Sequence, residues 1–242
     1  MDDGFDIGFL LFPGLTQLDL TGPAQVLSRM SGARVHFIAR TIAPVPSDCG
    51  LSLSPTCTFE TAPELDLICV PGGMGVDSVI ADSESLGYVR RAGEGAAYVT
   101  SVCTGSLILG AAGLLAGYQA ACHWAWRDLL PLFGASPCED RVVVDRNRIT
   151  GGGVTAGIDF AFHVVEAVRG LAEAEMIRLA LEYDPQPIGL GGTPSTARST
   201  VLQAVRRRYD AAGLGARREA ISRLAASLGV AGGEPHFPKI GL

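Results

Sequence analysis

Residues 96–112 contain the feature that most constrains the fold, because an apolar run passes almost directly into a helical run. The run Ala96-Ala97-Tyr98-Val99-Thr100 predicts a strand, and the residues from Ser106 to Ala112 predict a helix. Only Ser101-Val102-Cys103-Thr104-Gly105 connects the two. A strand that turns sharply into a helix is typical of domains in which strands and helices alternate, as in the nucleophile elbow of serine hydrolases.

Cys103 occupies the turn of this junction and is the first candidate for chemistry. Its sulfur is expected at a helix N-terminus, where free N–H groups and the macrodipole favour a thiolate. Gly105 suits the junction because the backbones of the strand and the helix approach closely there. Cys103 is therefore a candidate nucleophile, and the alternative is a buried structural thiol.

Composition limits the class of protein. The 242 residues are 48% hydrophobic, with mean hydropathy +0.29, which is enough for a substantial core in one large or two small domains. We expect no export signal and no membrane anchor, since no apolar stretch approaches a bilayer span. The six cysteines form no C-x-x-C pair and no zinc-like spacing with histidine, which predicts free thiols, a reducing cytoplasm and no metal site.

Charge is unevenly distributed along the chain. The net charge is −6, but the residues from Thr193 onward carry eight Lys and Arg against three Asp and Glu. An acidic body argues against nucleic acid as a partner, and the basic end is more typical of a solvated helix face or a subunit contact.

Strands and helices are expected to alternate along the chain. Apolar runs at residues 5–12, 35–39, 65–70 and 96–100 predict strands, and helical patterns follow several of them. Residues 42–59 suggest a β-hairpin excursion, and residues 141–150 suggest a strand pair. This order predicts a mainly parallel sheet with helices on both faces and with sites at the carboxyl ends of the strands.

The domain boundary is expected near residue 192. Residues 1–192 are predicted to form the α/β catalytic domain. Residues 184–194 are rich in proline and glycine, which indicates a linker or wrapped loop. Residues 193–242 are then expected to form a helical extension, packed on the same domain or at a dimer interface.

Asp19 is the best candidate for an acid or base beside Cys103, because it follows the turn of the first strand. A carboxyl group enclosed by Leu18, Leu20 and a thiolate is expected to have a raised pKa and to act as an acid near neutral pH. The alternative is an N-cap for a helix that begins at Pro23, or simple exposure.

Two glycine-rich turns are candidates for backbone donors. Gly72 and Gly73 are expected to present N–H groups to a ligand, together with the N–H of Thr104, unless they serve turn geometry alone. Residues 151–156 match the dinucleotide fingerprint only loosely. They lie late in the chain after a hairpin, so we expect this loop to pack against the Cys103 turn instead of binding a nucleotide.

Histidines and tryptophans supply weaker candidates. His123 follows a short predicted strand and is either a secondary partner of Cys103 or a locally bonded side chain. Trp124 and Trp126 are expected either to wall a pocket or to pack in the core.

These motifs together resemble the ThiJ/PfpI group of class I glutamine amidotransferase-like proteins, and within it the isocyanide (isonitrile) hydratases. The similarity runs from about Asp6 to Tyr183 and more loosely beyond. It is carried by Phe9-Leu10-Leu11-Phe12-Pro13, Leu18-Asp19-Leu20-Thr21-Gly22-Pro23, Val70-Pro71-Gly72-Gly73, residues 99–106 around Cys103, Ala121-Cys122-His123-Trp124 and residues 150–159.

The resemblance implies a flavodoxin-like three-layer sandwich, a homodimer, a cytoplasmic location, and no metal or organic cofactor. It implies that Cys103 is the nucleophile, that Asp19 is its acid/base partner, and that Thr104 follows the nucleophile in the catalytic set. The backbone amide of Val154 is implied to face the sulfur. The implied reaction adds water to an isocyanide through a covalent thioimidate on the cysteine and yields an N-substituted formamide.

Two other classes of function share parts of this pattern. One is the non-catalytic ligand-sensing domain of amidotransferase-like AraC-type regulators, although only some fifty residues follow Thr193, fewer than their DNA-binding module needs. The other is a thiol-based stress response that rests on oxidation of Cys103 and does not require Asp19.

Overall fold

A mainly parallel sheet forms the centre of the molecule. The structure is a computed structural model that describes residues 4–186, 189 and 191–229. Within these residues the main sheet has seven strands in the order β10-β11-β7-β6-β1-β2-β5, and only β10 runs antiparallel to its neighbour. The strands are β1 Phe5–Leu10, β2 Ala33–Ala39, β5 Cys57–Thr58, β6 Leu67–Val70, β7 Tyr98–Val102, β10 Val142–Asp145 and β11 Arg148–Gly151.

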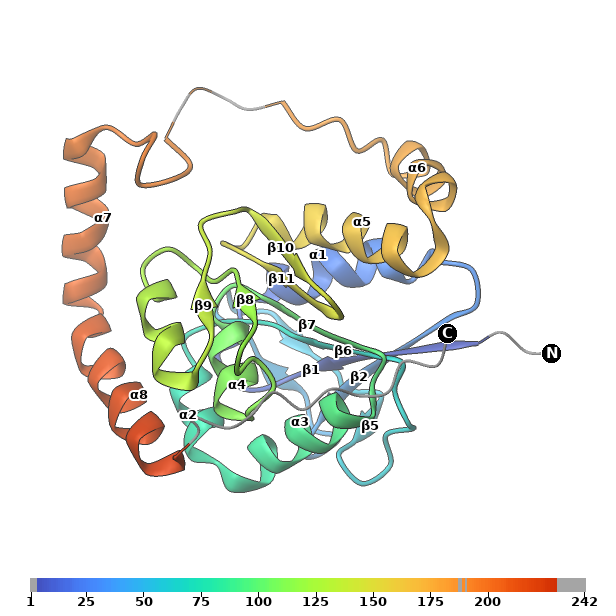
Figure 1. Cartoon of the computed structure of the whole chain (residues 1–242), viewed down its shortest axis with the longest axis horizontal. Helices are drawn as coiled ribbons and strands as arrows, with labels where there is room; N and C mark the ends of the chain where they lie inside the picture. Colours follow the sequence, from blue (N-terminus) through green and yellow to red (C-terminus); the bar gives the residue numbers. More distant parts are fainter. Residues whose placement is uncertain (1–3, 187–188, 190, 230–242) are drawn as a thin grey trace.

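Helices cover both faces of this sheet (Figure 1). One face carries α1 Gln17–Leu27, α5 Ala156–Arg169 and α6 Leu171–Ala180, and the other carries α2 Val76–Ala81, α3 Ser83–Gly95 and α4 Gly105–Ala111. Two short pairs lie outside the sheet, namely β3 Val45–Pro46 with β4 Ser52–Leu53 and β8 Gln119–Ala120 with β9 Ser136–Pro137. The three-layer, flavodoxin-like architecture expected from the sequence is confirmed.

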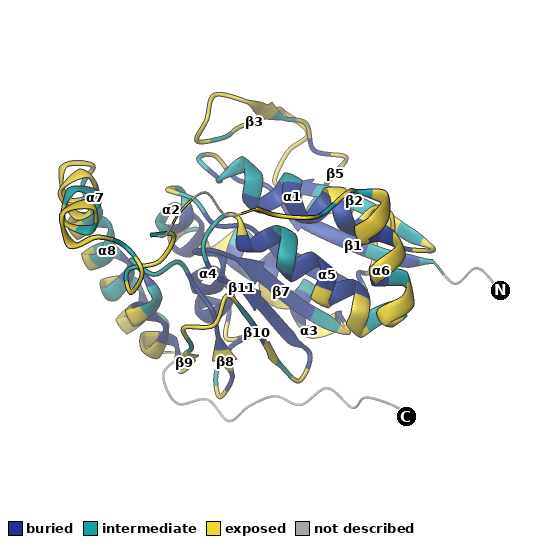
Figure 2. Ribbon diagram, turned by 90° about the horizontal axis from the view of Figure 1, so that it is seen from above, coloured by how far each residue is buried: buried dark blue, intermediate teal, exposed yellow. Residues whose placement is uncertain are grey.

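The buried central strands explain why the apolar runs are continuous. All four residues of β6 are at most 1% exposed, because helices pack on both of its faces. β1 is nearly as buried, and the central strands are coloured as buried throughout Figure 2. Strands that are covered by helices on both faces of the sheet cannot alternate apolar and polar residues, so their sequences appear as apolar runs.

The carboxyl ends of the central strands meet at one edge. In β6 and β7, Val70 pairs with Ser101, and in β11 and β7, Gly151 pairs with Val102. The residues that follow these pairs, Gly72, Cys103 and Gly152, therefore lie side by side. This is the convergence that the alternating pattern predicts.

Three local predictions were wrong. α1 begins at Gln17 and contains Pro23, so Asp19 lies in the first turn of the helix and not in a loop before it. α2 was not expected. The residues from His123 to Leu130 have a pattern that predicts a helix, but the segment forms a turn and then a 3₁₀ helix, η1 Arg127–Phe133. The Pro131 ring inside η1 is compatible with this short, tight helix but not with a long α-helix.

The C-terminal part forms two helices beside the body, α7 Ser199–Ala211 and α8 Leu214–Leu228 (Figure 1). α8 packs on α2 and η1 through the buried residues Ile221 and Ala225, whereas α7 has no buried residue (Figure 2). The division at residue 192 stays a prediction, and residues 230–242 of the expected extension lie outside the described residues. Among the described helices, none is long and apolar enough to cross a membrane.

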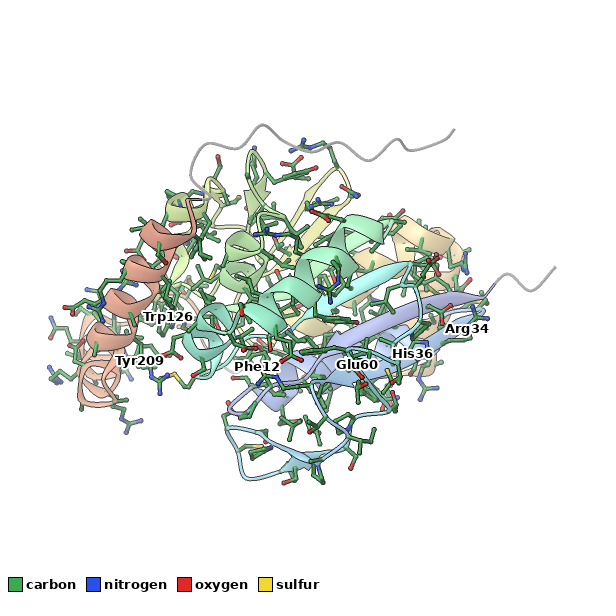
Figure 3. All side chains as sticks on the ribbon, turned by 90° about the horizontal axis from the view of Figure 1, so that it is seen from below. Phe12, Arg34, His36, Glu60, Trp126 and Tyr209 are labelled. Carbon is green, nitrogen blue, oxygen red and sulfur yellow. The ribbon has the colours of Figure 1, made fainter. Side chains whose placement is uncertain are left out.

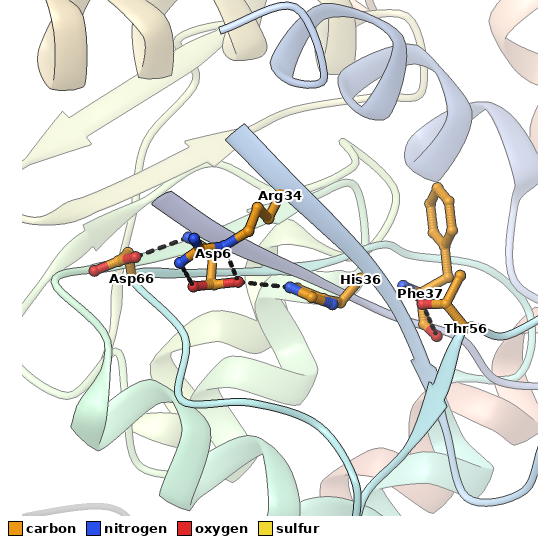
Figure 4. A network of polar contacts seen from close by, with 6 residues as sticks. All are labelled: Asp6, Arg34, His36, Phe37, Thr56 and Asp66. Carbon is orange, nitrogen blue, oxygen red and sulfur yellow. Dashed lines mark hydrogen bonds and ion pairs between the residues drawn. The ribbon is translucent and has the colours of Figure 1, made fainter. Parts of the chain in front are cut away.

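A charged network lies toward the amino-terminal end of β1 and β2, away from the Cys103 edge (Figure 4). The Asp6 carboxylate accepts hydrogen bonds from Nε and Nη2 of Arg34 at 3.0 and 2.5 Å, and its Oδ1 lies 2.7 Å from Nε2 of His36. The N–H of Asp6 donates to Asp66 at 2.8 Å. The Arg34 hydrogen bond, above all, lowers the pKa of Asp6 to about 2.

Candidate active site

Cys103 lies at a strained turn between β7 and α4. Its φ angle is +59°, a left-handed conformation that costs a non-glycine residue about 1 kcal/mol. Its N–H donates to the carbonyls of Gly151 at 3.0 Å and Gly152 at 2.8 Å, which holds the turn against the end of β11. A Cβ at Gly105 would lie 2.0 Å from the carbonyl oxygen of Val70, so this position requires glycine. The expected sharp turn with a close backbone approach is confirmed.

Asp19 is fully buried beside Cys103. The first turn of α1 carries its side chain inward, where Oδ2 accepts a hydrogen bond from the N–H of Gly72 at 3.0 Å. Oδ1 is buried and has no partner within hydrogen-bonding geometry among the described residues. The Cys103 thiol is close enough to interact with the carboxyl group. Asp19 therefore has one anchored oxygen and one that is available for proton transfer.

Burial raises the pKa of Asp19 to about 7 and outweighs the opposing effects of the Gly72 hydrogen bond and of the nearby Cys103 thiol. The raised pKa that the sequence predicts is thus confirmed, and its main cause is removal of the carboxyl group from water. A group with this pKa is present in both protonation states near neutral pH, as a catalytic acid or base should be.

The Cys103 thiol differs from the sequence prediction of a favoured thiolate. Burial, followed by the charge of Asp19, raises the pKa of Cys103, and the N–H of Thr104 opposes this only in part. α4 has only seven residues, so its dipole does not outweigh the loss of solvation. When the pair holds one proton, that proton therefore lies on the thiol beside an ionised Asp19, and the thiolate forms by transfer within the pair.

Gly72, Gly73 and Thr104 have uses that the sequence did not reveal. The N–H of Gly72 holds Asp19, and the N–H of Gly73 donates to Oγ1 of Thr104 at 2.9 Å. The expectation that these two N–H groups face a ligand therefore needs correction, because each is engaged by a side chain of the protein. The Thr104 hydroxyl positions the loop after β6, while its backbone N–H is the group that reaches the sulfur.

Val154 lies in the loop that connects β11 to α5. This loop packs on the Cys103 turn through Gly151 and Gly152, as expected. Val154 is half-buried there and its carbonyl accepts from Gly157 at the start of α5. The role of its N–H as a donor to the reacting atoms stays a proposal.

His123 lies near the site but is bonded locally. Its Nδ1 accepts a hydrogen bond from the N–H of Ala125 at 3.2 Å, and burial lowers its pKa to about 4. The ring is therefore neutral near pH 7, and one of its nitrogens is already occupied. This geometry favours a locally bonded role for His123 over a role as a base for Cys103.

Tyr209 is a residue of the site that the sequence analysis missed. It extends from α7 to the rings of His123 and Trp124, with centroids 6.1 and 5.8 Å away. The only signal in the sequence is that Leu202, Val205 and Tyr209 share one helical face. Trp124 is half-buried in this cluster, whereas Trp126 is buried in the core, so the two tryptophans have different roles.

The described residues contain no group of three or more His, Cys, Asp or Glu side chains that could hold a metal ion. The cysteines among them are all free thiols.

Comparison with known proteins places this geometry in a family. A family model described as the DJ-1/PfpI family matches residues 6–167, which include every strand of the sheet except the first residue of β1 and also include both Asp19 and Cys103. The chain belongs to the DJ-1/PfpI family. The match ends before α6, so α7 and α8 lie outside the part that the family model describes.

Individual relatives cover more of the chain. Isonitrile hydratase from Pseudomonas putida is 51% identical over 222 residues, which is 92% of this chain and 97% of the hydratase. The crystal structure of a ThiJ/PfpI family protein from Pseudomonas syringae superposes with a TM-score of 0.86 at 43% identity and covers 92% of this chain and 90% of that one. The resemblance stated from the sequence motifs is confirmed by both.

A transcriptional regulator is more distant in sequence. The HTH-type transcriptional regulator GbdR of Pseudomonas aeruginosa is 30% identical over 201 residues, which is 76% of this chain but only 54% of the regulator. The chain therefore matches about half of that protein, whereas it spans nearly all of the hydratase.

Proposed function

We propose that this chain is an isocyanide hydratase, a lyase that adds water to the terminal carbon of R–N≡C and releases an N-substituted formamide. The observation that carries the proposal is the contact between a buried nucleophile, Cys103, and a buried acid, Asp19, at the carboxyl edge of the sheet. The near full-length similarity to an isonitrile hydratase supports it.

The first half of the reaction forms a thioimidate. Asp19 accepts the proton of the Cys103 thiol, the sulfur attacks the terminal carbon of the isocyanide, and the same proton passes from Asp19 to that carbon. The bond formed is S–C, and the product R–N=CH–S–Cys103 contains the hydrogen that the thiol has lost. The pair enters this step with one proton and leaves Asp19 ionised.

The second half hydrolyses the thioimidate. Ionised Asp19 removes a proton from water, the hydroxide adds to the former isocyanide carbon, and Asp19 passes that proton to the substrate nitrogen. Expulsion of sulfur then gives R–NH–CHO, and the proton of the added hydroxyl group returns to Cys103. One carboxyl group is sufficient because Asp19 enters and leaves each half ionised, and it carries the thiol proton in the first half and a water proton in the second.

The backbone around the pair supports these steps. The N–H of Thr104 stabilises negative charge on sulfur, and the N–H of Gly72 holds the carboxyl group in place through both protonation states. We assign the N–H of Val154 to the sulfur or to the added water, since the loop that carries it packs on the Cys103 turn.

The two rival classes have weaker support. A ligand-sensing regulator domain does not require an acid with a pKa near 7 beside the thiol, and the GbdR similarity covers only about half of that regulator. A thiol sensor is expected to have a low pKa at its cysteine, whereas burial raises the pKa of Cys103.

The test is conversion of cyclohexyl isocyanide to N-cyclohexylformamide, followed by ultraviolet absorbance and mass spectrometry. Cys103→Ala and Asp19→Asn are expected to abolish turnover, while the matched control Cys49→Ala, which removes an exposed thiol, retains it. Undiminished turnover in either of the first two variants would exclude the mechanism. Oxidation of Cys103 to sulfinic acid without hydration would favour the stress-response alternative.

We further propose that the protein acts as a cytoplasmic homodimer without a metal or organic cofactor. Leu171, Met176 and Leu179 of α6 are 57%, 64% and 83% exposed, which is unusual for large apolar side chains on a single helix and suits a subunit contact. Light scattering after size exclusion tests the dimer, and a Leu179→Glu variant that remained dimeric would exclude α6 as its interface.

A further inference from the structure

The C-terminal helix α8 is tied to both loops that flank the catalytic pair. Arg217 donates through Nη1 to the carbonyl of Met74 at 2.5 Å and to Asp77 at 2.8 Å. Met74 directly follows Gly72 and Gly73, whose N–H groups hold Asp19 and Thr104. The first arginine therefore fixes α8 to the loop that positions the acid.

The next residue reaches the opposite loop. Arg218 donates to the carbonyl of Ala125 at 2.5 Å and forms an ion pair with Asp128 at 2.5 Å. Ala125 is the residue whose N–H bonds His123. Two consecutive arginines thus hold α8 across the rim of the site, and α7 is joined to α8 through Gly213.

This placement directs Tyr209 of α7 toward the site. In Figure 3 the Tyr209 side chain extends from α7 toward the body of the protein, on the side where Trp126 lies. Its ring packs on Trp124 and meets His123 edge-on. His123 in turn lies against Gly153, because a Cβ at Gly153 would be 3.6 Å from Cδ2 of His123.

Gly153 belongs to the loop that contacts Cys103. The N–H of Cys103 donates to the carbonyl of Gly152, the preceding residue. Burial, and after it the charge of Cys103, raises the pKa of Tyr209, so the phenol lies within electrostatic reach of the thiol. A continuous set of contacts therefore runs from the backbone of Cys103, through Gly152, Gly153 and His123, to a residue outside the family-matched region.

A hollow of about 470 Å³ adjoins the same aromatic pair. Trp124 and Tyr209 form part of its wall, and Arg206, Leu214 and Arg218 complete much of the rest. The Tyr209 ring therefore lines this hollow on the side where it meets Trp124 and His123. Removal of the ring is expected to widen the hollow toward the loop that carries these two residues.

We propose that α7 and α8 form the outer wall of the substrate site, and that Tyr209 limits the size of the N-substituent that the site accepts. Aromatic rings suit this role, since an alkyl or aryl substituent on an isocyanide is apolar and packs on Tyr209 and Trp124. The substrate class rests on the proposed function, whereas the position of the wall does not.

The test compares a small and a bulky substrate, ethyl isocyanide and 1-adamantyl isocyanide, in wild type, Tyr209→Ala, Tyr209→Phe and the control Arg207→Ala. Arg207 lies on the exposed side of α7. Tyr209→Ala is expected to raise the bulky-to-small ratio of kcat/KM by about tenfold, on the scale of discrimination by apolar pockets. Tyr209→Phe and Arg207→Ala are expected to keep the wild-type ratio. A ratio in Tyr209→Ala within twofold of wild type would overturn the proposal.

A second measurement separates this proposal from the hydratase assignment. The rate of alkylation of Cys103 is followed by mass spectrometry of its peptide, with N-ethylmaleimide and the bulkier N-(1-pyrenyl)maleimide. The wall predicts that Tyr209→Ala accelerates the bulky reagent selectively. If no isocyanide is hydrated but this selectivity appears, the proposed role of Tyr209 is supported and the proposed function is excluded. If isocyanides are hydrated but neither the kcat/KM ratio nor the alkylation ratio changes, only the proposed role of Tyr209 is excluded.

Discussion

Asp19 and Gly72 are 53 residues apart in sequence, and a 3.0 Å hydrogen bond joins the carboxyl Oδ2 of the first to the backbone N–H of the second. The bond links α1 to the loop after β6, and it fixes one oxygen of a carboxyl group that is otherwise enclosed by apolar side chains. Burial makes ionisation of Asp19 costly to the stability of the fold, and the Gly72 bond offsets only part of that cost. Burial thereby supplies the acid that the proposed reaction needs.

Replacement of Asp19 by Asn is expected to stabilise the fold at pH 8. Because the pKa of Asp19 is raised from 3.8 to about 7, the folded protein holds a proton that the unfolded chain releases, and stability falls as pH rises from about 4 to about 7. Once Asp19 is fully ionised, this pKa shift corresponds to a loss of roughly 4 kcal/mol in the free energy of unfolding. Urea unfolding at pH 5 and pH 8 should therefore show that the free energy of unfolding of the wild type falls between these pH values, whereas that of Asp19→Asn does not. Equal pH dependence in the two proteins would contradict the assigned pKa.

The rate of hydration is expected to rise with pH through about 7. Below this pH both Asp19 and Cys103 carry protons, so no base is available to take the thiol proton. Above it the pair holds one proton, which is the reactive state, and this state persists to high pH because the pKa of Cys103 is also raised. Measurement of kcat/KM between pH 5 and 9 checks the prediction. A rate that falls through pH 7 would instead require a doubly protonated pair.

The Asp6 network is expected to stabilise the fold without affecting catalysis. The pKa of Asp6 is lowered to about 2, so its contribution is complete above about pH 4 and is lost as pH falls through 2. Asp6→Asn should lower the free energy of unfolding at pH 7 by about 1 kcal/mol, as expected for partly exposed ion pairs. The stability of this variant should also fall less on acidification than that of the wild type. Thermal melts from pH 2 to 7 measure this, with formamide production as the control that should not change.

The sequence predicted the features that depend on local pattern. Apolar runs placed the buried strands, and the abrupt junction predicted both the sharp turn at Cys103, where φ is +59°, and the need for glycine at 105. The position and raised pKa of Asp19 followed from its apolar neighbours and from the rule that parallel strands present sites at their carboxyl ends.

The sequence did not predict features that depend on competition between distant groups. The thiolate expected from the dipole of α4 is opposed by burial and by the charge of Asp19. The sequence motif does not show how large either of these two effects is. The N–H groups of Gly72 and Gly73 are engaged by side chains that come from other elements. Tyr209 reaches the site because α8 is held in place by Arg217 and Arg218 and by its packing on α2 and η1, and no local pattern contains these relationships.

Gly72→Ala is expected to disable the site more than it destabilises the fold. A Cβ at this position would lie 2.5 Å from the N–H nitrogen of Thr104, 2.6 Å from its Oγ1 and 2.9 Å from Cβ of Cys103. The loop must therefore move away from the turn, which lengthens the bond to Asp19 and misaligns the acid and the sulfur. Displacements of this size reduce rates on the order of a hundredfold.

The matched control for Gly72→Ala is Gly87→Ala. Gly87 lies inside α3, and its added Cβ would meet only Nη1 of Arg91, at 3.5 Å. This change should leave turnover intact and stabilise the helix by about 0.5–1 kcal/mol, because alanine has less conformational freedom to lose than glycine. Hydration rates and melting temperatures of both variants separate the two effects. Full activity in Gly72→Ala would show that the Gly72 bond does not position Asp19, since no alanine fits there without displacing it.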